Sequence, residues 1–385
     1  MNGIYVHLPY CERKCRYCDF YSQTQFSGLP VFLESLTKEI NLKGQQPLFN
    51  SAQYDSVFIG GGTPSLLPPI DLQNLFDNLH KTFFIKNSAE ITIECNPNSV
   101  SLEQLVQYKE TGINRISFGV QSFDDSELQF LGRIHNANEA VKACELANKT
   151  DFDNISIDLI WGIPGQSPES WLKTLNTAIE LGVKHISAYC LIYEENTPMY
   201  QDWKSGKILR MDEDAEAELY DILCKVMSDN GFEHYEISNF AKPGYKCLHN
   251  LMYWKGGDYL GFGPSAHSFV EGKRSWNYSD LNKYIELLKK DELPVEAEET
   301  LTDTQILNEM IMLGFRSEGL EIRKINEKFG LDIMVQLYPL ITNLKNRGLL
   351  IADKDRLCLT DSGYILCQEI TLQFVMQTEK FIVLG

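Results

Sequence analysis

The first half of the chain alternates short apolar runs with helical stretches, and this alternation limits the fold more than any other feature. Each run is rich in β-branched residues, and each stretch between runs carries apolar residues three and four positions apart. The predicted strands are residues 3–8, 56–61, 90–95, 115–120, 155–160 and 185–192, and the predicted helices lie near 29–43, 70–83, 101–110, 124–149 and 168–181. Because right-handed crossovers join such strands in parallel, we expect an α/β fold of six β/α units.

Polar residues gather just after the predicted strands. An open doubly wound sheet and an incomplete barrel both fit the alternation, but a barrel brings all of these strand ends to one mouth. The residues are Cys11, Gly60 to Thr63, Glu94, Gln121, Asp158 and Tyr193. We therefore predict a partial (β/α)6 TIM-like barrel over residues 1–210.

The pattern changes after residue 210. A helix is expected over 212–230, and the glycine- and aromatic-rich segment 245–269 is expected to form short strands and turns. From residue 302, short helical patterns precede a strand, a polar turn, a second strand and a helix, an order that resembles an α+β winged-helix module. The predicted domains are 1–210, a connecting region 211–300 and a C-terminal domain 301–385.

Charge and composition exclude several classes of function. The chain has 35 Lys and Arg against 53 Asp and Glu, and its net charge of -18 repels phosphate backbones, so nucleic acid is not expected as a partner. No apolar run approaches the ~20 residues that span a bilayer, and no leader peptide precedes the first strand. We expect a cytoplasmic protein, which leaves peripheral membrane contact open.

The 10 cysteines of the chain are too sparse for a disulfide scaffold, so thiolates remain available for a metal.

Three of these cysteines lie on one short loop after the first strand. Cys11, Cys15 and Cys18, in the segment "CERKCRYC", follow the spacing C-x3-C-x2-C. Structural zinc usually takes four ligands from two separated pairs. Three soft thiolates on one loop instead suit an iron-sulfur cluster that keeps one iron open for a small-molecule ligand.

The segment "GGGTP", Gly60 to Pro64, ends the second predicted strand. Glycines there let backbone groups approach a ligand, and the proline restricts the turn. A tight turn between strand and helix explains the motif equally well when it is taken alone. Its position one β/α unit after the cysteine loop favours a ligand site.

Together these motifs resemble the radical SAM superfamily. The resemblance implies that Cys11, Cys15 and Cys18 hold a 4Fe-4S cluster, whose open iron binds S-adenosylmethionine and can cleave it to a 5'-deoxyadenosyl radical. Tyr17, just before the last cysteine, also fits the family pattern. The glycine motif then corresponds to the element that contacts the methionine end of the cofactor, through Gly61, Gly62 and Thr63.

Further residues resemble the coproporphyrinogen dehydrogenase-like group of that superfamily. Each has a simpler explanation alone, such as a helix cap for Glu94, a surface ion pair for Arg133 or a loop carboxylate for Asp158. The resemblance implies that the set binds one or two S-adenosylmethionine molecules. The matching residues are Tyr5, Glu94, Gln121, Arg133 and Asp158.

Two branches of the group compete. One is the oxygen-independent coproporphyrinogen III dehydrogenase of porphyrin synthesis, and the other is the HemW-type haem chaperone. The dehydrogenase pattern has a further cysteine where this chain has Phe20, and it has an N-terminal extension that is absent here. The segment "HNLMYW", His249 to Trp254, matches a haem-binding motif of the chaperone branch, which implies that His249 is an axial ligand of haem iron.

We therefore predict a haem-binding chaperone that carries a 4Fe-4S cluster and S-adenosylmethionine. The resemblance extends over nearly the whole chain and implies a homodimer that delivers haem to acceptor haem proteins, respiratory or other. The alternative is the coproporphyrinogen III dehydrogenase, and a winged-helix regulator that senses redox state is disfavoured by the acidic charge. Whether the chain is an enzyme stays open, and no catalytic residue is assigned.

Overall fold

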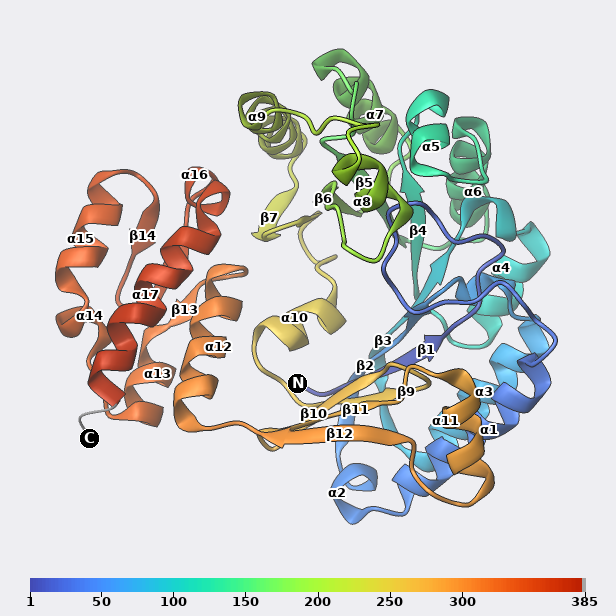
Figure 1. Cartoon of the computed structure of the whole chain (residues 1–385). Helices are drawn as coiled ribbons and strands as arrows, with labels where there is room; N and C mark the ends of the chain where they lie inside the picture. The colour runs from blue at the N-terminus through green and yellow to red at the C-terminus, as the bar shows by residue number, and fades with distance from the viewer. Residues whose placement is uncertain (383–385) are drawn as a thin grey trace.

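The computed structural model describes residues 1–382 and has a parallel sheet at its centre (Figure 1). Six strands pair in parallel with their neighbours in chain order, which confirms the predicted α/β fold. They are β1 (Gly3–Leu8), β2 (Gln53–Gly61), β3 (Phe84–Cys95), β4 (Arg115–Gln121), β5 (Asn154–Trp161) and β6 (His185–Cys190). The predicted first strand has the observed bounds. Strands β2 and β3 begin earlier than predicted, β4 ends one residue later, β5 is one residue longer at each end, and β6 ends at Cys190 instead of residue 192.

Helices connect these strands, and each of them except the four-residue α2 buries at least one side chain. They are α1 (Leu29–Gly44), α2 (Pro47–Asn50), α3 (Pro69–Thr82), α4 (Leu102–Glu110), α5 (Asp125–Leu131), α6 (Ala137–Lys149), α7 (Pro168–Glu180) and α8 (Pro198–Lys204), with 3-10 turns at Pro64–Leu66 and Pro97–Ser99. Local sequence sets their starts. The Ser101 side chain, for example, accepts the Gln104 N–H and forms a capping box at the start of α4.

The prediction of one helix over 124–149 was wrong. Gly132 adopts a left-handed backbone (φ 78°) that ends α5, and the Asn136 side chain caps the start of α6. The connection between the two helices carries Arg133. This break therefore places a cation beside the cysteine loop instead of on a helix surface.

Later strands extend the sheet at both ends, so that it has 12 strands in the order β12-β11-β10-β9-β1-β2-β3-β4-β5-β6-β8-β7. Strand β9 pairs in parallel with β1, and β8 pairs antiparallel with β6. The added strands are β7 (Glu233–Glu236), β8 (Asn239–Ala241), β9 (Tyr259–Phe262), β10 (His267–Val270), β11 (Lys273–Asn277) and β12 (Val295–Thr300). The helices of this region are α9 (Glu213–Asp229), α10 (Leu248–Trp254) and α11 (Leu281–Lys289), and α10 replaces part of the segment predicted as strands and turns.

The C-terminal module lies to one side of the main sheet in Figure 1. It combines helices with a small sheet in the order β13-β15-β14, as the winged-helix-like prediction expected. Its elements are α12 (Asp303–Phe315), β13 (Leu320–Glu321), α13 (Ile322–Phe329), α14 (Ile333–Gln336), α15 (Tyr338–Asn346), β14 (Leu350–Ala352), β15 (Arg356–Leu359), α16 (Asp361–Ile365) and α17 (Cys367–Ile382). Glu318 of the module forms ion pairs with Lys246 and Lys255 of the preceding region, with N–O distances of 3.0 Å each.

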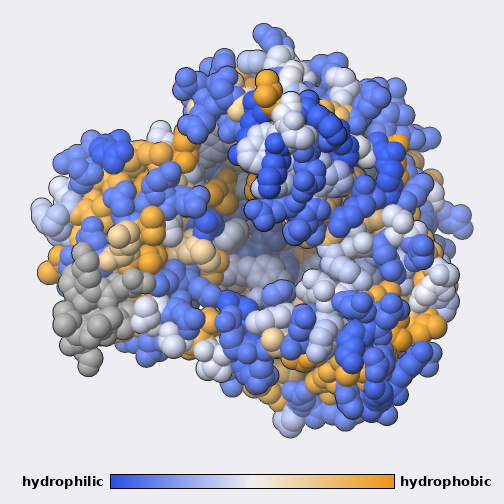
Figure 2. All heavy atoms as spheres, in the orientation of Figure 1, coloured by the Kyte–Doolittle hydropathy of each residue, from blue (hydrophilic) through white to orange (hydrophobic). Residues whose placement is uncertain are grey.

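The surface drawn in Figure 2 is hollowed at its centre, between the C-terminal module and the main sheet. The side chains around this hollow are mostly hydrophilic, while apolar side chains fill the space between the sheet and its helices. Among residues 1–382, no helix is long and apolar enough to cross a membrane.

Candidate functional site

The cysteine loop follows β1 and is closed at its base by backbone hydrogen bonds. The Cys11 N–H donates to the Gln23 carbonyl (2.9 Å), and the Gln23 N–H donates to the Pro9 carbonyl (2.8 Å). Cys11, Cys15 and Cys18 are partly exposed free thiols that line one cavity of about 560 Å³. The structure therefore brings the three predicted cluster ligands to one place.

The spacing of the three sulfurs fits a cluster better than a single ion. Ligands of one zinc ion lie at ~2.3 Å from it, which brings their donor atoms close to one another. Among the described residues, the three sulfurs do not all lie within 4.8 Å of one another. In a 4Fe-4S cluster each thiolate binds a different iron, so the sulfurs need not approach one another as closely as the ligands of one ion do.

The glycine motif packs against the cysteine loop. The Gly62 N–H donates to the Leu8 carbonyl (2.8 Å), and the Thr63 N–H donates to the Tyr10 carbonyl (2.7 Å). A Cβ at Gly62 would lie 2.4 Å from the Tyr10 oxygen, so no larger residue fits there. Thr63 Oγ1 lies 3.6 Å from Cys11 Sγ, which joins the two motifs in one wall of the cavity.

Two partly buried carboxyl groups form another wall. Glu94 Oε2 accepts the Gly61 N–H at 3.1 Å, and Asp158 Oδ1 accepts the Ser117 hydroxyl at 3.4 Å. Burial, reinforced by the negative charge of Asp158, raises the pKa of Glu94 to about 8. Burial also raises the pKa of Asp158. A cationic ligand in this cavity would lower the pKa values of both carboxyl groups, because it favours their ionised forms.

Arg133 links the cysteine loop to the sheet. Its guanidinium donates to Cys15 Sγ (3.3 Å), to Asn96 Oδ1 (2.6 Å) and to the Gly119 carbonyl (2.6 Å). The Asn96 amide also donates to Thr63 Oγ1 at 3.2 Å. Sequence reasoning missed Asn96, although its position directly after β3, two residues beyond Glu94, was a usable signal.

Of the other predicted cofactor residues, two line the cavity and one does not. Gln121 ends β4 with a left-handed backbone (φ 69°), an unusual conformation for a residue other than glycine, and it lines the cavity. Tyr17 lines it as well, and burial raises the pKa of its hydroxyl. Tyr5 does not line the cavity. Its hydroxyl hydrogen-bonds to His7 Nδ1 (3.0 Å), and its ring stacks on Phe58.

His249 lies at the opposite end of the strands. It belongs to α10 and packs against Ser56, which pairs with Gly3, the first residue of β1. The side chain is 2% exposed, its Nδ1 hydrogen-bonds to Ser56 Oγ (2.9 Å), and its Nε2 hydrogen-bonds to the Tyr253 hydroxyl (3.1 Å). Burial lowers the pKa of His249 to about 3, so the imidazole is neutral. The structure therefore separates His249 from the cysteine cavity.

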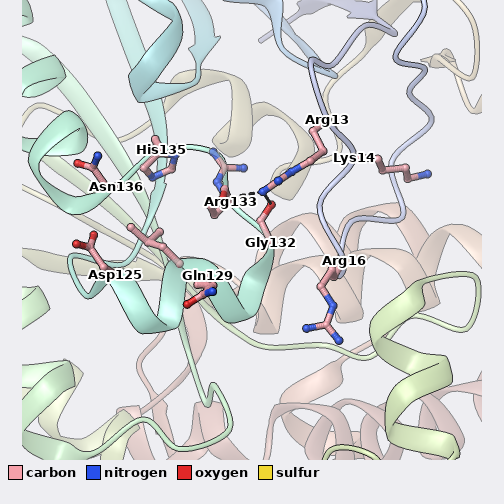
Figure 3. Close-up of a pocket in the computed structure, with 10 residues that line it drawn as sticks. Arg13, Lys14, Arg16, Asp125, Gln129, Gly132, Arg133, His135 and Asn136 are labelled. Atoms are coloured by element: carbon pink, nitrogen blue, oxygen red, sulfur yellow. Dashed lines mark hydrogen bonds between the residues drawn. The ribbon is translucent and has the colours of Figure 1, made fainter.

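A second cavity of about 480 Å³ lies beside the cysteine loop and is basic (Figure 3). Arg13 donates from it to the carbonyls of Gly132 (2.5 Å) and Arg133 (2.8 Å). Arg16 donates to Asp202 at 2.7 Å. These cations, with Lys14, occupy the positions between the three cysteines, and sequence reasoning did not single them out.

Apolar side chains border the mouth of the cysteine cavity. Phe20 is 71% exposed and Ile192 is 64% exposed, and both line it. Large apolar side chains left this exposed at a cavity are typical of a site for an apolar ligand.

Comparisons with known proteins place the chain in a family. The model of the Radical SAM superfamily matches residues 5–196, and that of the HemN C-terminal domain matches residues 301–366. The chain is similar to "Heme chaperone HemW" of Bacillus subtilis (34% identity, 96% of this chain and 98% of the relative). It is also similar to the proteins of that name from Lactococcus lactis (31%, 99% and 99%) and Escherichia coli (39%, 70% and 70%).

Among solved structures, the chain resembles coproporphyrinogen III oxidase (HemN) from Escherichia coli, described as a radical SAM enzyme. The TM-score is 0.83 at 22% identity, over 97% of this chain and 89% of that one. At this level of identity the likeness concerns the fold alone.

Proposed function

The chain belongs to the HemW family of haem chaperones within the radical SAM superfamily, and from this premise we propose that it binds haem and transfers it to acceptor haem proteins. The observation that carries the proposal is the neutral imidazole of His249, within the segment "HNLMYW" on α10, because a neutral imidazole is the form that binds haem iron. The three thiols, which line a cavity at the other end of the strands, would serve a separate cofactor. Acceptors would be respiratory or other haem proteins, and the chaperone would act in the cytoplasm as a homodimer.

The proposed cofactor site uses the residues described above. Cys11, Cys15 and Cys18 would hold a 4Fe-4S cluster, which supplies one-electron chemistry and one open iron when it is bound. Gly61, Gly62 and Thr63 would present backbone groups to S-adenosylmethionine. The carboxylates of Glu94 and Asp158 would favour the positive charge of its sulfonium, while Tyr17, Gln121 and Arg133 bound the remainder of the cavity. Tyr5 does not line the cavity, and it would act on the site through its hydrogen bond to His7, whose ring packs against Gly61.

His249 is the proposed axial ligand of haem iron. Its imidazole is neutral, which is the form that binds a metal. Ligation through Nε2 requires that the Tyr253 hydroxyl give up its hydrogen bond to that nitrogen. Because both residues lie on α10, rotation of one tyrosine side chain, together with opening of the packing around α10, would free the lone pair.

A transfer assay tests the proposal. The chain with its cluster assembled is loaded with haem, separated from free haem and mixed with an apo haem protein. Haem should appear in the acceptor faster than it does from an equal amount of haem bound to albumin. If the chain retains no haem after separation, or if transfer is no faster than from albumin, the proposed function is wrong.

The alternative function is the oxygen-independent coproporphyrinogen III dehydrogenase. We predict no conversion of coproporphyrinogen III to protoporphyrinogen IX, because Phe20 stands where the dehydrogenase pattern has a cysteine and cannot take its role. Anaerobic incubation with S-adenosylmethionine and a reductant, followed by porphyrin analysis, checks this. Sustained formation of protoporphyrinogen IX would favour the dehydrogenase.

Binding of S-adenosylmethionine should depend on pH through Glu94. With a pKa of about 8, this carboxyl is mostly protonated at pH 7, and a bound cation favours its ionised form. Binding therefore releases a proton below pH 8, so affinity should rise with pH by up to ~10-fold per unit and level off above 8. Magnetic resonance titrations of the reduced cluster at several pH values measure this.

Two variants isolate the Glu94 contribution. Glu94→Gln should flatten the pH dependence, because the amide does not titrate. Glu12→Gln, on an exposed residue of the cysteine loop, should preserve the wild-type slope. If the affinity for S-adenosylmethionine changes equally with pH in Glu94→Gln and in wild type, Glu94 does not belong to the proposed site.

A further inference from the structure

Three potential metal ligands from separate elements meet where the C-terminal module contacts the main sheet. Cys224 lies on α9, His234 on β7 and Asp361 at the first position of α16. One ligand atom from each lies within 4.8 Å of the other two, and this is the only such trio in the described part of the chain. Because 127 positions separate His234 from Asp361, tertiary packing alone brings them together.

Two of the three ligand atoms already lie side by side. His234 Nδ1 hydrogen-bonds to Asp361 Oδ1 at 2.8 Å, so an ion bound by both would replace the proton that they share. The third ligand, the Cys224 thiol, interacts with the Tyr220 hydroxyl one helical turn earlier on α9.

The aromatic surroundings hold the imidazole in place. Its ring stacks on Phe240 (centroids 4.2 Å apart) and contacts Tyr364 (4.6 Å), and only 11% of the side chain is exposed. Asp361 is 63% exposed, which leaves the cluster open to solvent on one side. An ion could enter from that side and keep a water ligand there.

We propose that Cys224, His234 and Asp361 bind one Zn²⁺ ion, which joins the C-terminal module to the main sheet. One thiolate, one imidazole and one carboxylate form a donor set that zinc prefers, and a water completes a tetrahedron. Zinc binds the thiolate form of cysteine, so ion binding releases the Cys224 thiol proton to solvent. The site is independent of the cysteine loop and of the proposed transfer of haem.

Metal analysis and zinc-edge X-ray absorption test the proposal on the full chain with its iron-sulfur cluster assembled. The iron of the cluster does not contribute at the zinc edge. The chain is treated with a mild chelator, given Zn²⁺ and separated from free metal. We expect one zinc per chain, with one sulfur at ~2.3 Å and the other ligands at ~2.0–2.2 Å.

Single substitutions then locate the ion. Cys224→Ser and Asp361→Asn should each weaken zinc binding by at least ~10-fold. Asp361 is exposed, so its variant should fold normally, which circular dichroism checks. Cys358→Ser, on a partly buried cysteine of β15, should bind zinc like the wild type. Absence of bound zinc, equal affinity in Cys224→Ser, or an ion with three sulfur ligands would each overturn the proposal.

Discussion

Replacing Cys11, Cys15 and Cys18 together with Ala is expected to abolish the iron and sulfide that anaerobic reconstitution incorporates. These thiols line one cavity, and thiolates are the ligands that hold an iron-sulfur cluster. Burial raises the pKa of Cys18 to about 11, so its thiolate forms only when a metal replaces the proton. Iron and sulfide analysis, with the visible absorption spectrum, measures the loss.

Cys190 provides a matched control. It is a partly exposed thiol that lines the same cavity but ends β6 and lies outside the loop. Cys190→Ala should therefore incorporate the full amount of iron and sulfide. Retention of the cluster in the triple variant, or its loss in Cys190→Ala, would contradict the proposed ligands.

Replacing His249 with Ala should weaken haem binding strongly and shift the Soret band, because it removes the proposed axial nitrogen. The cluster should remain intact, since its ligands follow the opposite ends of the strands. The substitution also leaves a cavity and removes the hydrogen-bond partner of the buried Ser56 hydroxyl. We therefore expect a loss of roughly 2–4 kcal/mol in the free energy of unfolding. Haem titration and chemical denaturation of the same samples separate the two effects.

Tyr253→Phe distinguishes ligation from simple packing. This change removes the hydroxyl that hydrogen-bonds to His249 Nε2 and keeps the aromatic ring. If His249 binds iron, the freed nitrogen should hold haem at least as tightly as in wild type. An unchanged Soret band and affinity in His249→Ala would place the ligand elsewhere, with His7, His267 and Cys247 as the next candidates.

The sequence by itself determined the series of parallel strands and the positions of the cysteine loop and the glycine motif. Alternation of apolar runs with helical stretches is a local pattern, and the first strand was predicted with its observed bounds, Gly3–Leu8. The cysteine spacing and the glycine motif are also local, and parallel pairing of β1 with β2 brings them together. Once strand order is known, residues that follow neighbouring strands must meet at one end of the sheet.

Tertiary structure decided what depends on pairs of residues far apart in the chain. The motif around His249 indicated its type of chemistry but not that α10 packs it against Ser56, at the end of the sheet away from the cysteines. The contact between Arg133 and Cys15 spans 118 positions and depends on the break at Gly132, which a continuous helical pattern concealed. Periodicity reports which face of an element is buried, whereas contacts between elements depend on packing that no local pattern records.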